Sequence, residues 1–275
     1  MKTRKLRDLE VSAVGYGCMG FSHGYGALPP KQEAIRLMRM AYDLGCTHYD
    51  TAEGYGNGAN EELVGEALKP IRHHVTIATK LHLSSGENLA QQVEDRLDAS
   101  LKRLQTDYVD LYYQHRNEAR IPDEEVAGIM GKLIQKGKIR GWGQSQTSPE
   151  EIRRANAVTP LTAIQSEYSM MERMFEKEVI PTCKELGIGF VAFSPMASGF
   201  LSGKYTTDMS YTGDDVRRVI TRFSKDNVTA NQPLLDMLNE ISAKKGSRLP
   251  SFPLHGCCTR RTSSSQSPVC AVTNG

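Results

Sequence analysis

Thr47-His48-Tyr49-Asp50-Thr51-Ala52-Glu53-Gly54-Tyr55-Gly56 is the stretch that decides the fold. Its first half, Thr47–Thr51, is short and rich in residues that favour strands. Its second half comes after the strand and contains a tyrosine between two glycines, a composition typical of a loop. A carboxylate and a phenol therefore lie at the C-terminal end of one predicted strand, at Asp50 and Tyr55.

The same pattern recurs along the chain, because short strand-like segments alternate with helical patterns. In Lys31–Leu44, for example, apolar residues recur at helical spacing after a Pro-Pro pair. Other helices are expected at Asn60–Leu68 with Asn60 as cap, Leu89–Leu104, Asp123–Lys136, Glu176–Leu186 and after Ser148-Pro149. The seven predicted strands are Val14–Met19, Thr47–Thr51, Val75–Lys80, Tyr108–His115, Ile139–Ser145, Ala163–Tyr168 and Gly189–Ser194.

Ordered strand–helix alternation predicts parallel strands joined by crossover helices. A doubly wound sheet is the main rival to a barrel. Short strands that each lead to a polar residue favour a (β/α)₈ TIM barrel, whose C-terminal strand ends carry the site. No Gly-x-Gly-x-x-Gly turn opens the first helix, which argues against a Rossmann dinucleotide fold.

Composition narrows the class of protein. The chain has 275 residues, enough for one large α/β domain, and a formal net charge of only +2. Neither a nucleic-acid partner nor a membrane partner is expected, since no apolar run approaches the roughly 20 residues of a membrane span. The polar N-terminus does not resemble a signal peptide. These features predict a cytoplasmic protein.

The six cysteines fall into two groups. Cys18, Cys46 and Cys183 lie in apolar or strand-like contexts and are expected to be reduced core thiols. The others lie near His255, at Cys257, Cys258 and Cys270. Their spacing fits no usual zinc pattern, so no metal site is predicted.

Asp50, Tyr55, Lys80 and His115 would together form a proton-donating site at the barrel mouth. A free phenol has a pKa of about 10, and a nearby ammonium stabilises the phenolate and lowers that value. Each residue also has a structural reading: Asp50 as a cap, Tyr55 as a packing residue, Lys80 as a solvated cation and His115 as a core group. Their occurrence at successive strand ends favours catalysis.

The segments Asp50–Gly56, Ala78–Lys80 and Leu111–His115 closely resemble the aldo-keto reductase family, and the resemblance runs from about Arg4 to about Lys245. It implies an enzyme that reduces aldehydes or ketones to alcohols with NADPH. It also implies that Tyr55 is the general acid and Lys80 the residue that perturbs its pKa. Asp50 would hold Lys80, and His115 would orient the carbonyl. The alternative is an inactive reductase or a non-catalytic cofactor-binding subunit.

The resemblance also implies the residues that bind the cofactor. Phe193 would stack on the nicotinamide, and Gln146 departs from the family's commoner Asn. NADPH preference is inherited from the family, because the residues that recognise the 2′-phosphate are not found in this frame. Besides Asp50, the implied contacts are Met19, Gly20, Ser145, Gln146, Gln165, Phe193, Ser194, Pro195, Met196, Gly199, Leu201, Ser202, Gly203 and Lys204.

The substrate is a small aldehyde or ketone whose identity the sequence leaves open, as it does the oligomeric state. Phe21, Tyr25 and Tyr55 are expected to line an apolar pocket, with Arg116 and Asn117 at its rim. The methionines after the sixth strand are expected to pack locally. These are Met170, Met171 and Met174.

The C-terminal region departs from the family pattern, which predicts a barrel over residues 1–246 and an aberrant tail over 247–275. The tail is expected to lack a normal eighth strand and last helix, which would leave open sheet edges and lower stability. Synonymous codons can be chosen for Ser251 through Val269 so that a second reading frame, starting at the third base of each codon, encodes a different peptide. That peptide ends Phe-Ile-Val-Pro-Ile-Pro-Gly. That segment looks like the family's eighth strand. The hypothesis is a frameshift, and the coding DNA would test it.

Overall fold

Eight parallel strands close into a barrel in the computed structural model, which describes residues 1–247 and 269–273. Around the barrel their order is β10-β3-β4-β5-β6-β7-β8-β9. The predicted (β/α)₈ class is therefore confirmed, and closure excludes the doubly wound rival. The strands are β3 (Val14–Gly17), β4 (His48–Asp50), β5 (Thr76–Leu81), β6 (Leu111–Gln114), β7 (Trp142–Ser145), β8 (Ala163–Glu167), β9 (Gly189–Phe193) and β10 (Val269–Thr273).

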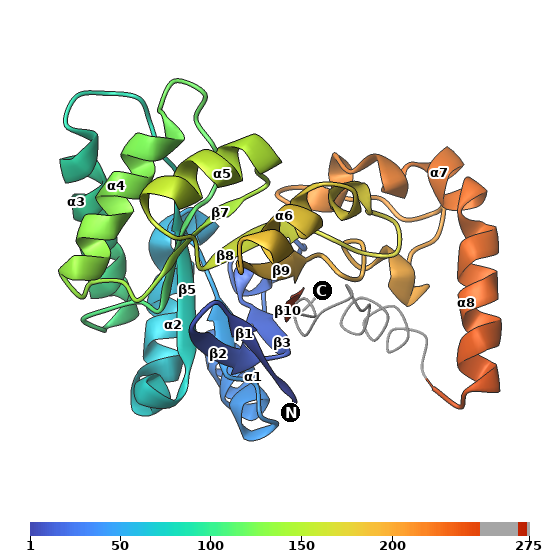
Figure 1. The fold of residues 1–275 in the computed structure, drawn as a ribbon. Helices are drawn as coiled ribbons and strands as arrows, with labels where there is room; N and C mark the ends of the chain where they lie inside the picture. The colour runs from blue at the N-terminus through green and yellow to red at the C-terminus, as the bar shows by residue number, and fades with distance from the viewer. Residues whose placement is uncertain (248–268, 274–275) are drawn as a thin grey trace.

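Helices form the outer layer (Figure 1). Six of them lie between successive strands from β3 to β9, so each strand is followed by a crossover helix that returns the chain to the start of the next strand. In the described part of the chain, two more follow β9 and stand on the side of the barrel opposite α3 and α4. The helices are α1 (Lys31–Asp43), α2 (Ala59–Leu68), α3 (Leu89–Leu104), α4 (Asp123–Gln135), α5 (Pro149–Val158), α6 (Val179–Glu185), α7 (Lys225–Ala230) and α8 (Gln232–Lys244).

The N-termini of α5 and α2 can be compared with the helix starts predicted from the sequence. At α5, Ser148 Oγ accepts from the backbone N–H of Glu151 at 3.3 Å, and the Glu151 carboxylate accepts from the backbone N–H of Ser148 at 2.7 Å. This capping box confirms the predicted start. The prediction that Asn60 caps α2 is wrong, because the N-cap is Gly58, in the left-handed region. Asn60 is buried one position into the helix and donates to the carbonyl oxygen of Cys18 at 2.8 Å.

Two apolar layers hold the barrel together. The larger lies between strands and helices, where buried side chains such as Ile77, Trp142 and Ile164 meet the apolar faces of the helices. The smaller fills the barrel interior and includes Leu111 and Val191. Burial of this apolar surface is the main favourable contribution to folding.

One end of the barrel is covered by an antiparallel hairpin of β1 (Thr3–Leu6) and β2 (Leu9–Ser12). Leu6 and Val11 belong to the interior cluster. A Cβ at Gly189, the first residue of β9, would collide with Leu6, so the hairpin packs against the start of that strand. The accessible end of the barrel is therefore the one where the strands finish.

The closing strand corrects a prediction. The residues after Gly246 were expected to supply no strand, yet β10 pairs with β3 at four positions and with β9 at two, beginning with Val269 opposite Val191. Val269 is 1% exposed and packs in the barrel interior. The expected open edges are therefore absent from the described barrel, although the seam with β9 is short.

Other predictions about the tail concern residues outside the described ranges. Most of the proposed frameshifted segment, and the residues that would follow an eighth strand, lie outside the described residues (248–268 and 274–275). His255, Cys257 and Cys258 lie there as well.

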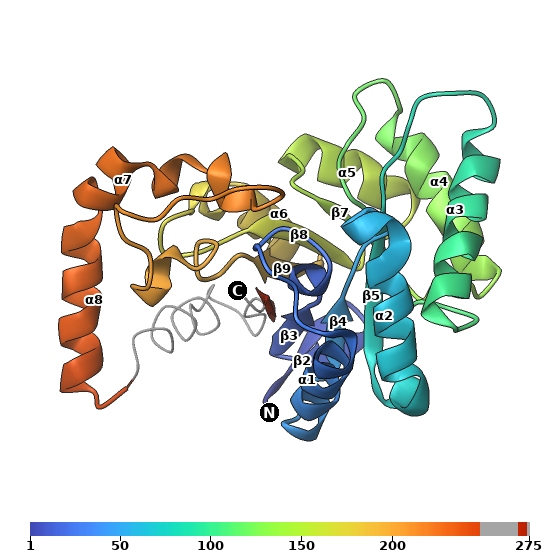
Figure 2. The ribbon, with the colours of Figure 1, turned by 180° about the vertical axis from the view of Figure 1, so that it is seen from behind.

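Residues 194–247, which follow β9, form a lobe beside the barrel (Figure 2). It contains short 3₁₀ turns at Phe200–Ser202, Val216–Arg218 and Thr221–Phe223, followed by α7 and α8. A third apolar cluster holds the lobe together, and α8 contributes buried leucines to it. The buried members are Ala197, Phe200, Leu201, Phe223, Val228, Leu235 and Leu238.

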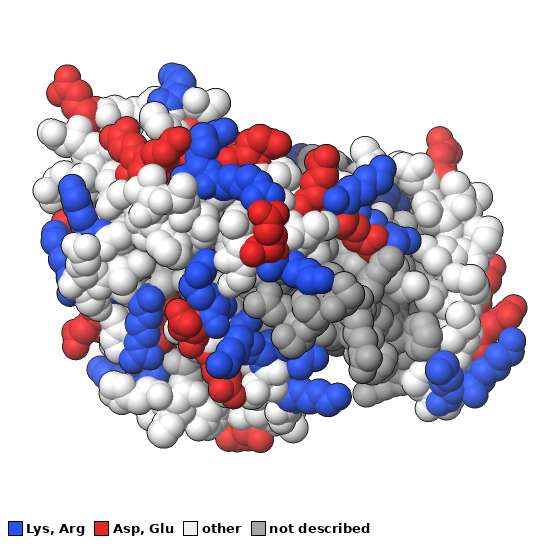
Figure 3. Space-filling view, viewed as in Figure 1, with Lys and Arg blue, Asp and Glu red and all other residues white. Residues whose placement is uncertain are grey.

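The surface agrees with the near-neutral composition. Basic and acidic side chains are interspersed over the face shown in Figure 3, without a large area of one sign. Within the described ranges, no helix combines the length and the apolar character needed to cross a membrane. Cys18, Cys46 and Cys183 are free and buried, as predicted.

Candidate active site

The four residues predicted to be catalytic converge where the barrel strands finish. Asp50 is the last residue of β4, Lys80 lies near the end of β5, and His115 directly follows β6. Tyr55 begins the 3₁₀ turn Tyr55–Gly58 that follows β4. Parallel strands carry the side chains at their C-terminal ends to one rim, which accounts for the convergence.

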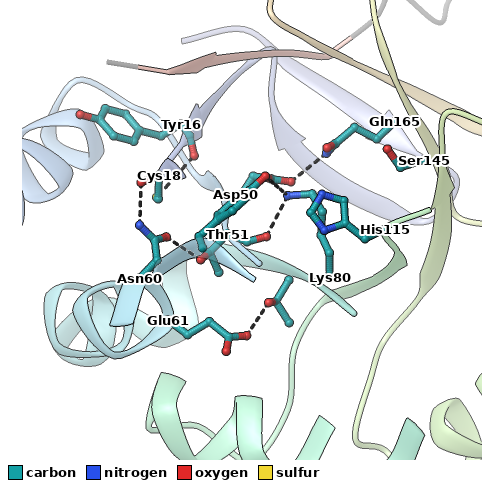
Figure 4. Close-up of polar contacts among 12 residues, drawn as sticks. Tyr16, Cys18, Asp50, Thr51, Asn60, Glu61, Lys80, His115, Ser145 and Gln165 are labelled. Atoms are coloured by element: carbon teal, nitrogen blue, oxygen red, sulfur yellow. Dashed lines mark hydrogen bonds and ion pairs between the residues drawn. The ribbon is translucent and has the colours of Figure 1, made fainter. Parts of the chain in front are cut away.

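Lys80 is the centre of the group (Figure 4). It is 1% exposed and forms a hydrogen-bonded ion pair with Asp50. Its ammonium also donates to the carbonyl oxygen of Thr51 at 2.8 Å and lies 3.3 Å from the phenol oxygen of Tyr55. All three donors of the ammonium are therefore directed at named acceptors, which fixes its position.

The pKa of Tyr55 differs from the prediction, and that of Lys80 is shifted as well. Burial works to lower the pKa of Lys80, but Asp50 and Tyr55 outweigh burial and raise it, so the ammonium stays charged. Burial raises the pKa of Tyr55 above its ordinary value, and the nearby Lys80 opposes burial without overcoming it. The predicted net lowering of the Tyr55 pKa is therefore wrong for this structure, and the phenol is protonated near neutrality.

His115 is a neutral imidazole. Burial, assisted by the positive charges of Lys80 and Arg116 and by His82, lowers its pKa to about 2. Its ring lies edge-on to Tyr55, with centroids 5.9 Å apart, and it packs against His82 at 4.2 Å. Nδ1 is buried without a hydrogen-bond partner in the described part of the chain. His115 can thus donate a hydrogen bond to a ligand without carrying a charge.

A cavity of about 220 Å³ opens beside these groups. Its wall includes Asp50, Tyr55 and His115, and it extends to Phe193 and Ser194 at the end of β9. Across the mouth, Gln165 of β8 donates to the second carboxylate oxygen of Asp50 at 2.8 Å. The cavity therefore extends from the phenol of Tyr55 to the C-terminal ends of β8 and β9.

The sequence model described as "Aldo/keto reductase family" matches residues 13–252. The chain belongs to the aldo-keto reductase family.

Individual relatives agree with this membership. A probable aldo-keto reductase 1 from Glycine max is 39% identical over 246 residues, which cover 86% of this chain and 71% of the relative. A glycerol dehydrogenase from Gluconobacter oxydans superposes with a TM-score of 0.86 at 26% identity, covering 99% of this chain and 86% of that one. An aldo-keto reductase from Klebsiella pneumoniae, solved in complex with NADPH, gives 0.76 at 24% identity, covering 100% and 86%, and shows the shared fold.

Six of the residues that the family resemblance implies for cofactor binding line the cavity. Gln165 and Ser145 lie on neighbouring strands, β8 and β7, and Phe193 ends β9. The six are Met19, Asp50, Ser145, Gln165, Phe193 and Ser194.

The remaining cofactor candidates lie beside the cavity rather than in its described wall. Gln146, in the left-handed region at φ 57°, accepts from the backbone N–H of Glu167 at 3.3 Å. The side chain of Leu201 is fully buried in the third cluster, so it can offer a ligand only its backbone. Gly20, Pro195, Met196, Gly199, Ser202, Gly203 and Lys204 also lie beyond the described wall.

The loop after β9 has an unusual backbone. Ser194, Ala197 and Ser198 all have positive φ, at 50°, 52° and 56°, and Gly199 follows at 93°. Non-glycine residues rarely adopt this region, and such strain concentrates at sites that hold ligands. The loop begins at the cavity wall, with Ser194 and Ser198 both lining it.

The predicted substrate pocket is partly formed as expected. Tyr25, Tyr55 and Arg116 line the cavity. Phe21 is instead 5% exposed and stacks on Tyr16 in the outer core, and Asn117 donates to the hydroxyl of Thr147 at 3.2 Å.

The methionine prediction holds only in part. Met171 packs against the third cluster. Met170 and Met174 are 38% and 68% exposed, so local packing does not account for Met174.

Sequence reasoning missed several residues of the cavity. Glu167 is two positions beyond Gln165, on the same strand face, and the period of two along β8 could have revealed it. Val216 and Ile220 reach the cavity from the lobe after β9, and no local pattern marks them. A loop contact of this kind depends on long-range packing.

Proposed function

We propose that this protein reduces the carbonyl group of a small aldehyde or ketone to an alcohol, with NADPH as hydride donor and Tyr55 as general acid. The observation that carries the proposal is the 3.3 Å approach of the Lys80 ammonium to the Tyr55 phenol in a shared cavity with His115. Family membership and the NADPH complex of the Klebsiella pneumoniae relative support the choice of cofactor.

The residues present fit a nicotinamide cofactor. The cavity provides an amide at Gln165, a hydroxyl at Ser145 and an aromatic ring at Phe193, which suit a carboxamide and a flat ring. When bound, NADPH supplies the hydride that the carbonyl carbon accepts. The strained loop from Ser194 to Ser198 is the proposed neighbour of the rest of the cofactor.

Each catalytic side chain has a separate task in this proposal. Tyr55 donates its proton to the carbonyl oxygen as negative charge develops there. Lys80 stabilises the phenolate that remains, and Asp50 keeps Lys80 charged and in place. Neutral His115 donates a hydrogen bond that orients the carbonyl. The high pKa of Tyr55 suits this role, because an acid must hold its proton until the transition state.

Steady-state reduction of para-nitrobenzaldehyde with NADPH tests the proposal. We expect turnover by the unchanged protein and a loss of about 10²–10⁴-fold in kcat in Tyr55→Phe, the usual contribution of a general acid. Tyr42→Phe is the matched control, since Tyr42 packs against the outer core and does not line the described cavity wall. Turnover that survives Tyr55→Phe would show that the acid is misassigned.

Calorimetric titration with NADPH separates the enzyme from the non-catalytic alternative. Calorimetry is preferable to tryptophan fluorescence because Trp142, the single tryptophan, is buried in the outer core. Tyr55→Phe is expected to bind NADPH nearly as tightly as the unchanged protein. Binding without turnover in the unchanged protein would favour a cofactor-binding subunit.

A further inference from the structure

Arg116 is a charged residue of the cavity that the proposed chemistry does not use. It directly follows His115 at the end of β6 and lines the same cavity as Tyr55 and His115. A substrate bound in this cavity would therefore lie close to the guanidinium of Arg116.

Two hydrogen bonds hold the Arg116 side chain against the rim. Its Nη1 donates to the carbonyl oxygen of His115 at 2.5 Å and to the hydroxyl of Ser145 at 3.1 Å. Nε and Nη2 have no hydrogen-bond acceptor in the described part of the chain. The side chain is thus oriented by one nitrogen and leaves donors free for a ligand.

Charge balance around the cavity singles out the same residue. The carboxylate of Asp50 is paired with Lys80, and that of Glu167 with Arg222 at 2.8 Å. Among the described residues, Arg116 has no carboxylate within the 4.0 Å of an ion pair. Burial lowers the pKa of Arg116, but arginine remains protonated far above neutrality. The cavity therefore carries one positive charge that no carboxylate balances.

We propose that Arg116 selects substrates that carry a carboxylate on the molecule that also carries the carbonyl, and this inference rests on the proposed function. The free N–H groups of the guanidinium bind the carboxylate while Tyr55 and His115 hold the carbonyl oxygen. The carbonyl carbon gains a hydride from NADPH and the oxygen gains the proton of Tyr55. The product is a hydroxy acid, and the carboxylate is unchanged.

A purely structural role for Arg116 is the rival explanation. Its bond to Ser145 could serve only to position the hydroxyl that is proposed to contact the cofactor. Loss of that role would affect charged and uncharged substrates alike. Discrimination between two matched substrates therefore separates the explanations.

The test compares para-formylbenzoate with its methyl ester, which presents the same aldehyde without the negative charge. We expect kcat/KM to favour the acid by about 10–100-fold, since a hydrogen bond to a charged group contributes about 1.5–3 kcal/mol. Arg116→Gln should bring the ratio near one, and Arg116→Lys should retain part of the preference. Arg39→Gln is the control, because Arg39 also lacks a carboxylate partner in the described chain but lies on α1 and donates to the Ala67 carbonyl oxygen.

The outcomes separate the inference from the function on which it rests. Equal use of acid and ester by the unchanged protein, or an unaltered ratio in Arg116→Gln, overturns the inference and leaves carbonyl reduction standing. If neither aldehyde is reduced, the proposed function fails. In that event, calorimetric titration with para-(hydroxymethyl)benzoate tests whether Arg116 binds the carboxylate. Equal affinity in the unchanged protein and in Arg116→Gln overturns carboxylate binding by Arg116. About tenfold weaker binding by the variant supports it.

Discussion

Gln165 donates a hydrogen bond of 2.8 Å to Asp50 across the barrel mouth, and the two residues are 115 positions apart in the chain. The same carboxylate holds Lys80 through its other oxygen. The amide proposed to contact the nicotinamide is therefore tied to the ion pair that supports the proposed acid. In the proposed function, cofactor binding and proton donation therefore share one hydrogen-bond network.

Gln165→Leu tests this connection. The variant leaves one oxygen of Asp50 without its donor and removes the amide from the cavity wall. We expect the Kd for NADPH to rise up to about tenfold, because the variant removes the proposed hydrogen bond to the neutral nicotinamide carboxamide. Calorimetry measures the change. Gln114→Leu is the control, because Gln114 is a buried glutamine of the same barrel outside the described cavity wall, and equal weakening by both variants would contradict the connection.

The position of the four proposed catalytic residues could be predicted from local sequence. Asp50, Lys80 and His115 each lie at or next to the C-terminal end of a short strand, and a parallel barrel necessarily brings such ends together. The start of α5 was equally accessible, because the hydrogen bonds of a capping box join residues only three apart at Ser148 and Glu151.

What could not be predicted depends on contacts that are distant in sequence. Val269 pairs with Val191, and no pattern within Val269–Thr273 specifies that partner. Sequence showed a lysine available to Tyr55 but not the burial that outweighs it. The frameshift hypothesis stays a prediction, since nearly all of that segment is outside the described residues.

The pH dependence of carbonyl reduction should follow the high pKa of Tyr55. A phenol that must be protonated supports full activity below its pKa and none above it, and burial raises that pKa above the ordinary value of about 10. We expect kcat/KM for para-nitrobenzaldehyde at saturating NADPH to stay level from about pH 6 to about pH 9 and to fall only at higher pH. A decline centred near pH 7 or 8 would mean that Lys80 lowers the pKa of Tyr55 after all.

His115 should make the folded state sensitive to acid. Its pKa is lowered to about 2 in the folded protein, against about 6.5 in the unfolded chain. The stability it contributes is fully present above about pH 6.5 and is lost as the pH falls, because only the unfolded chain takes up the proton. Between about pH 7 and pH 5 this loss amounts to at most about 2 kcal/mol.

Urea unfolding at those two pH values measures the effect. His115→Gln should lose up to about 2 kcal/mol less than the unchanged protein on acidification, since the titrating imidazole is gone. His73→Gln is the control, because His73 is exposed on the turn Lys69–His74. An equal acid-induced loss in His115→Gln and the unchanged protein would show that His115 takes up its proton in the folded state.

Val269 provides a direct test of the eighth strand. Its side chain is 1% exposed and packs inside the barrel with Val191, at the seam where β10 and β9 pair over only two positions. Val269→Ala should lower the free energy of unfolding by about 2 kcal/mol, because two buried methyl groups are lost and a cavity remains. Val219→Ala makes the same chemical change at a side chain that is 75% exposed and should stay within about 0.5 kcal/mol of the unchanged protein. Urea unfolding of all three proteins compares the values, and equal stability for the two variants would mean that Val269 is not part of the barrel core in solution.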